Sequence, residues 1–93
     1  MTSLIHFPGG HALERGHECI SFPAVVGDRP VRCLITLGAL TARCGFRHAD
    51  GWEGAERALV KNVAAIQSEA ERLIRAGRFG GDAEVMISSL EAH

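Results

Sequence analysis

The sequence lacks most features that mark a specialised class of protein. It has no Tyr, one Trp, and one Lys among its ten basic residues. No apolar run approaches the roughly 18 residues that a membrane-spanning helix needs, so no contact with a membrane is expected. The opening stretch, residues 1–11, has neither the basic nor the apolar segment of a secretory signal. We therefore expect a cytoplasmic protein.

The three cysteines do not suggest a disulfide framework, because their number is odd and their spacing is irregular. This usage is typical of a reduced compartment, in which a buried free Cys acts as a small apolar residue. We favour that role for Cys33 and Cys44 and expect Cys19 to be the most accessible of the three.

Sequence motifs that would indicate chemistry are also missing. There is no CxxC, HExxH, GxSxG or glycine-rich phosphate loop. His11, His17 and Cys19 lie near one another in the sequence, but a surface loop can collect such residues by chance, so we expect no metal and no cofactor. Nothing here favours an enzyme, although an enzymatic role stays open. The net charge of −1 and the pI of about 6.5 argue against a dedicated nucleic-acid-binding domain.

What the sequence does contain is one long amphipathic segment, Trp52 to Ala76. At 100° per residue its apolar residues form a stripe, and its polar residues lie opposite. Asp50 with Glu53 suggests a capping box at its start, and Gly77 ends it. The stripe consists of Trp52, Ala55, Leu59, Val63, Ile66, Ala70, Leu73 and Ile74, and the opposite side of Arg57, Lys61, Ser68, Arg72 and Arg75.

A β-hairpin is the second clear prediction, with strands Cys19–Val26 and Arg29–Thr36 around the turn pair Gly27-Asp28. A two-residue loop pairs Val26 with Arg29 and Ile20 with Ile35. That register gathers apolar residues on one sheet face. They are Ile20, Phe22, Ala24, Val26, Val31, Cys33 and Ile35.

Shorter segments complete the chain. Ser3–Phe7 and Glu84–Leu90 are expected to be strands, and His11–Glu18 a loop. Thr36 is a plausible N-cap for a short helix, Leu37–Cys44, which Gly45 ends. The predicted fold is a single α+β domain over residues 1–93, in the order β-β-β-α-α-β. It is an antiparallel sheet of three to four strands, with one short and one long helix packed on one face.

Several of these segments resemble one protein family. The run from Phe22 to Thr36, followed by Leu40, is similar to small bacterial proteins known as domain of unknown function 1488. So are the opening Ile5-His6-Phe7 and the later stretch from Ile66 to Arg78. The resemblance implies a small α+β domain. It implies no activity and carries over no catalytic residue.

The sequence therefore leaves the function unknown. We favour a small interaction or adaptor module without catalysis, which binds a protein partner or a second copy of itself. The alternative is a weak nucleic-acid-associated protein that uses the Arg-rich end of the long helix. There Arg72, Arg75 and Arg78 recur every third residue, either as a docking strip or as side chains that offset the helix end and pair with Glu71, Asp82 or Glu84.

Overall fold

A computed structural model describes residues 4–77 and 84–88 of the chain, and its centre is the β3–β4 hairpin. Strands β3 (Cys19–Val26) and β4 (Arg29–Thr36) pair antiparallel, with Val26 opposite Arg29 and Ile20 opposite Ile35. The predicted register is therefore confirmed. Gly27, at the first central position of the turn, has φ 67°, which suits a type II′ hairpin turn.

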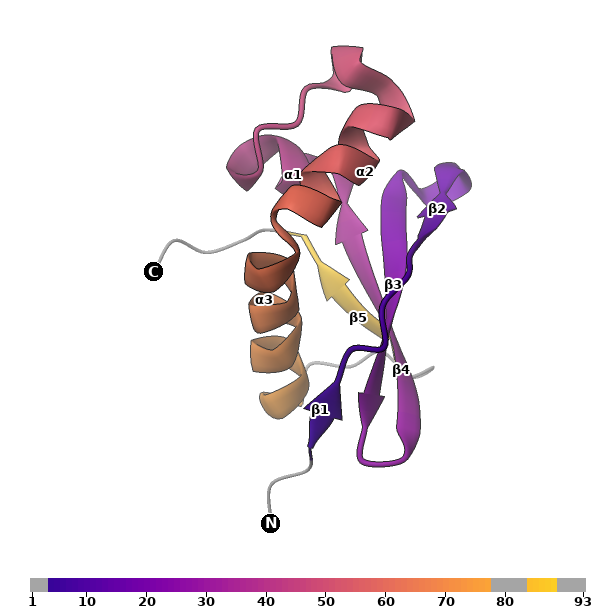
Figure 1. Cartoon of the computed structure of the whole chain (residues 1–93), viewed down its shortest axis with the longest axis vertical. Helices are drawn as coiled ribbons and strands as arrows, with labels where there is room; N and C mark the ends of the chain where they lie inside the picture. The colour runs from indigo at the N-terminus through magenta and orange to yellow at the C-terminus, as the bar shows by residue number, and fades with distance from the viewer. Residues whose placement is uncertain (1–3, 78–83, 89–93) are drawn as a thin grey trace.

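The sheet has five strands rather than three or four (Figure 1). β1 (Ile5–His6) and β2 (Ala12–Glu14) both pair with the outer edge of β3, and β5 (Glu84–Ile87) pairs with β4. The expectation of a loop from His11 to Glu18 was wrong. That segment contains β2 and the 3₁₀ helix η1 (Arg15–His17), because the half-buried Leu13 packs against the core.

The sheet is antiparallel except at β5, which runs parallel to β4. A chain that leaves β4 through a layer of helices returns at the end where β4 began, and it then pairs in the same direction. The prediction of a wholly antiparallel sheet missed this crossover, whereas the α+β class is confirmed. Val85 and Ile87 point into the core as predicted, and Met86 points outward.

The helices cover one face of the sheet (Figure 1). Helix α1 (Leu37–Arg43) begins as predicted, because the Thr36 hydroxyl accepts a hydrogen bond from the backbone N–H of Ala39 at 3.1 Å. Gly45, with φ 73°, follows the helix end. The 3₁₀ helix η2 (His48–Asp50) then leads into α2 (Gly51–Lys61) and α3 (Val63–Arg75).

The predicted long helix is thus two helices that meet at Asn62. Its predicted capping box was also wrong. Asp50 makes no side-chain cap to α2, because its carboxylate accepts a hydrogen bond from the backbone N–H of Arg47 at 3.2 Å. Gly77 does follow the end of α3, with φ 73°.

The core lies between the sheet and the helix layer. Ile20, Cys33 and Ile35 of the hairpin, with Leu40, Ile66, Val85 and Ile87, are fully buried. Most of the predicted helical stripe is buried too. Val63 is the exception at 42% exposed, since the break at Asn62 turns it out of the core.

Candidate interaction surface at the helix break

The N-terminal edge of the sheet is interrupted by a bulge. His6 lies opposite Val25 and Ala12 opposite Ser21, so five residues (7–11) face only three (22–24). Gly9 and Gly10 adopt φ 99° and 87°, which other residues rarely do. Pro23 lies in the facing stretch and has no N–H to donate there. We call residues 7–11 the edge bulge.

The edge bulge is tied to the helix layer by one polar contact. The His11 ring nitrogen Nε2 lies 2.7 Å from Oε2 of Glu56 on α2. This contact joins residues 45 positions apart and ties the bulge to α2. Bulges often occur where a sheet edge is shaped for a purpose beyond pairing.

A small apolar pocket lies between the edge bulge, β3 and the helix break. Its volume is about 140 Å³. Phe22 and Pro23 line it from the sheet, and Leu59 and Ile66 from the helices. A broader, open depression of about 530 Å³ lies on the other side of the bulge, over Pro23, Pro30 and Arg32. The edge bulge therefore separates the small pocket from the open depression.

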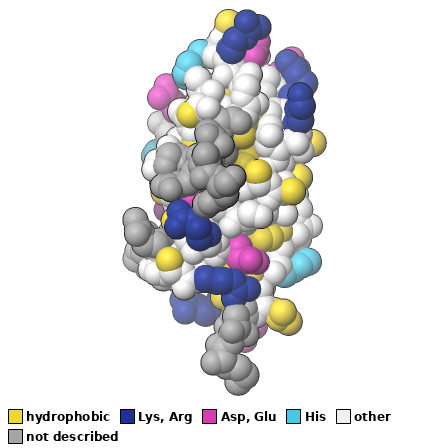
Figure 2. Space-filling view, turned by 90° about the vertical axis from the view of Figure 1, so that its left-hand side faces the viewer, with side chains coloured by type: hydrophobic (Ala, Val, Ile, Leu, Met, Phe, Trp, Pro, Cys, Tyr) yellow, Lys and Arg dark blue, Asp and Glu magenta, His cyan; other side chains and the backbone are white. Residues whose placement is uncertain are grey.

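Two exposed valines stand at the rim of the small pocket. Val60 is 61% exposed and Val63 42% exposed, and both line the pocket together with Gln67. Figure 2, which views the helix side, shows exposed apolar side chains over the middle of the molecule, with basic groups above and below them. Apolar side chains that flank an apolar hollow are typical of protein contact sites.

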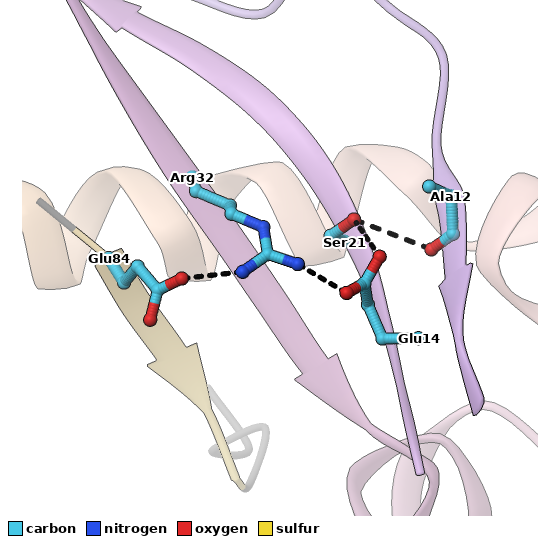
Figure 3. Close-up of polar contacts among 5 residues, drawn as sticks. All are labelled: Ala12, Glu14, Ser21, Arg32 and Glu84. Carbon is cyan, nitrogen blue, oxygen red and sulfur yellow. Dashed lines mark hydrogen bonds and ion pairs between the residues drawn. The ribbon is translucent and has the colours of Figure 1, made fainter. Parts of the chain in front are cut away.

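The open face of the sheet carries a charged bridge (Figure 3). Arg32 on β4 binds Glu84 on β5, with its Nη1 2.6 Å from Oε2, and its Nη2 binds Oε1 of Glu14 on β2. The hydroxyl of Ser21 donates to Glu14 at 3.3 Å. The hydrogen bonds to Glu84 and Glu14 raise the pKa of Arg32. Because one guanidinium joins strands at opposite edges of the sheet, we assign this bridge a structural role.

The positions of the three cysteines in the fold disfavour reactive thiols. Cys33 is wholly buried, and burial raises its pKa to about 11. Burial, followed by the nearby carboxylate of Glu14, also raises the pKa of Cys19. Cys19 is only 1% exposed, so the prediction that it would be the most accessible thiol was wrong. It faces the charged side of the sheet, but β2 beside it and the Glu14–Arg32 contact cover that position. Cys44 is half-buried, and none of the three cysteines forms a disulfide bond.

The Arg-rich end of the helix is only partly described. Arg72 binds Glu69 through two hydrogen bonds, of 2.8 and 2.6 Å, and Arg75 lies 3.7 Å from Glu71. Arg78 lies outside the described residues, as does Asp82. Glu84, a suggested partner, binds Arg32 instead. The docking strip of Arg72, Arg75 and Arg78 stays a prediction.

Neither a metal site nor a membrane span was found in the part of the chain that the structure describes. No three His, Cys, Asp or Glu side chains in residues 4–77 and 84–88 are grouped to hold a metal ion. Among the same residues no helix has the length and apolarity to cross a bilayer.

Two features of this surface, the edge bulge and the helix break, were not predicted, although the sequence contains residues that favour each. Two adjacent glycines between short apolar runs, Gly9-Gly10, suit a bulge. Asn62 lies inside the predicted helix Trp52 to Ala76, and its side-chain amide can compete for backbone carbonyls.

Comparison with known proteins gives a family and a fold. The model of a family described as "Protein of unknown function (DUF1488)" matches residues 5–87. The chain is also similar to a crystal structure, at 1.60 Å resolution, of a protein of unknown function from that family in Shewanella loihica PV-4. The TM-score is 0.84 at 18% identity, over 98% of this chain and 99% of that one. No curated protein matches the chain.

Proposed function

The chain belongs to the DUF1488 family, and from that premise we propose that it is a small cytoplasmic interaction module without catalysis. Its contact surface, in this proposal, is the pocket at the helix break together with Val60 and Val63. The family carries no assigned activity, so the proposal rests on the surface itself.

The observation that carries it is the exposure of Val60 and Val63 beside an apolar pocket. Burying one such side chain in a partner contributes about 1.5–3 kcal/mol to the free energy of binding. Two exposed valines therefore favour association of this surface with a partner. Phe22, Leu59 and Ile66 line the adjoining hollow, which suits one inserted apolar side chain.

Site-specific photocrosslinking in the native cell tests the proposal. A photoreactive amino acid at Val60 should give discrete crosslinked products, because that position lies within the contact. The matched control is the same amino acid at Met86, which is 51% exposed on the other face of the sheet. Products from Val60 that also disappear in a Val63→Asp background would support the proposal. Equal products from both positions, or none from Val60, would contradict it.

The alternative, a weak association with nucleic acid through the Arg-rich helix end, has less support. The two described arginines of that strip, Arg72 and Arg75, each have an acidic neighbour, which lowers the positive field that a phosphate backbone would meet. A photoreactive amino acid at Ser68 on α3 distinguishes the alternatives, since it would join the chain to nucleic acid only under the second one.

A further inference from the structure

Four residues around the small pocket have a spacing that is the same in both directions along the chain. Glu56, Val60, Val63 and Gln67 are separated by four, three and four residues. The structure places all four on one side of the helices. Val60, Val63 and Gln67 line the pocket, and Glu56 binds His11, which also lines it. We call these four residues the palindromic stripe.

A palindromic stripe is self-complementary when two copies meet antiparallel. A two-fold axis between residues 61 and 62 would place Val60 of one copy against Val63 of the other. The same axis would place Glu56 against Gln67. In such an isologous contact every pairing occurs twice, as in most homodimers.

The polar pair of this arrangement is also matched chemically. Oε2 of Glu56 is the oxygen that faces His11, and its side chain is 39% exposed. Oε1 can therefore accept a hydrogen bond from the side-chain amide of Gln67 in the second copy. A hydrogen bond to a carboxylate is stronger than one between neutral groups.

Resting on the proposed function, we propose that the partner of this surface is a second copy of the chain, bound through the palindromic stripe. The stripe runs across the helix break and is at most about 16 Å long, at roughly 1.5 Å per residue. A contact of that length is smaller than a standard protein interface, so the dimer is weak and reversible.

Charge substitutions at Gln67 test the pairing. Gln67→Lys should strengthen dimerisation, because the new ammonium group faces Glu56 of the other copy, and Gln67→Glu should weaken it. Each change should shift the dissociation constant by roughly two- to thirtyfold, from two partly exposed ion pairs per dimer. Sedimentation velocity over a dilution series measures the shift. The matched controls are Ser68→Lys and Ser68→Glu, one residue away on the exposed side of α3, which should leave the constant unchanged.

Disulfide crosslinking tests the register independently. In a Cys44→Ser background, mixed Val60→Cys and Val63→Cys chains should form the crossed disulfide faster than either forms a disulfide with itself. Opposite shifts for the two Gln67 variants together with a dominant crossed disulfide would support the inference. A chain that stays monomeric at millimolar concentration, Gln67 variants that shift the constant in the same direction, or a dominant self-disulfide would overturn it. Crosslinks from Val60 to a different protein, with a monomeric chain, would leave the proposed function standing and remove only the second copy.

Discussion

Asn62 shows how one side chain redirects a helix. Its side-chain Nδ2 donates to the carbonyl of Ala58 at 2.9 Å, and its backbone N–H is shared between the carbonyls of Ala58 and Leu59. Such tightening ends α2, and the carbonyl of Asn62 then accepts the N–H of Ile66 to begin α3. The turn moves Val63 out of the core and creates the rim of the pocket.

At Gly54 we predict that a change to Ala destabilises the protein, although helix propensity alone would predict a stabilisation. A Cβ added at this buried position would lie 2.2 Å from Cβ of Asp50, so Gly54→Ala should destabilise the protein by about 1–3 kcal/mol despite the better propensity of Ala. Gly38 in α1 is the control, since the nearest atom to its added Cβ is 3.8 Å away. Gly38→Ala should stabilise by about 0.5–1 kcal/mol. Urea denaturation measures both variants, and changes of the same sign would refute the argument.

The buried thiols predict a loss of stability at alkaline pH. Burial raises the pKa of Cys33 from 9.0 to about 11, so between these values the unfolded chain loses a proton that the folded one keeps. The contribution is present below about pH 9 and is lost as the pH rises through about 11. The free energy of unfolding should therefore fall, by up to about 1.4 kcal/mol per pH unit for this thiol.

A comparison with Cys33→Ala isolates this thiol, because the other two cysteines are present in both proteins, and the chain has no Tyr and a single Lys to add to the titration in this range. In denaturant melts from pH 8 to 11, the free energy of unfolding should fall more steeply with pH for the wild type than for Cys33→Ala. Equal slopes would show that the thiol of Cys33 does not ionise differently in the two states.

At the scale of elements, α2 and α3 each bury a different arc against the sheet. In α3, Ile66 and Ala70 are fully buried, while Val63 at its first position is exposed. A single helix would have buried Val63 and Ile66 together, as the sequence stripe predicted. The two valines at the break are therefore surface residues on account of the geometry of these elements.

Ile66 and Val63 test this division. Ile66→Ala should cost about 2–5 kcal/mol, because it opens a cavity in the core. Val63→Ala should stay within about 0.5 kcal/mol, as exposed substitutions usually do. Thermal and denaturant melts of the two variants decide it. Comparable losses would mean that the helix continues through Asn62.

The two described arginines at the end of α3 should differ in their effect on stability. Arg72 makes two hydrogen bonds to Glu69, whose side chain is only 6% exposed, whereas Arg75 and Glu71 are both about half exposed. Arg72→Gln should therefore cost about 1–2 kcal/mol after allowance for the exposed guanidinium, and Arg75→Gln less than about 0.5 kcal/mol. Denaturant melts measure both. A neutral Arg72→Gln would indicate that this arginine is held for a partner instead.

What the sequence predicts well is local. The hairpin register follows from alternation and a two-residue turn, and the Thr36 cap follows from side-chain chemistry. The parallel position of β5 did not follow, because it depends on where the helix layer returns the chain. The buried state of Cys19 did not follow either, since β2 and the Glu14–Arg32 contact that cover it belong to other strands. The pocket was missed for the same reason, as it joins residues of the edge bulge, β3 and both helices.

At the scale of the whole molecule, the helices cover one face of the sheet (Figure 1). The other face carries the Arg32 bridge (Figure 3). The edge bulge and the helix break meet around the small pocket, and His11 ties the bulge to Glu56 of α2. The central claim is that contact with other molecules occurs at this junction, rather than on the open sheet face or at the Arg-rich helix end.

Backbone amide NMR of the labelled chain tests that claim most directly. Spectra recorded over increasing concentration, and then with any crosslinked partner added, should show shifts confined to residues 9–11 and 56–67. The amides of β4 and of the last turn of α3 serve as internal controls and should not move. Shifts centred on β4 and β5, or on Arg72 and Arg75, would contradict the account.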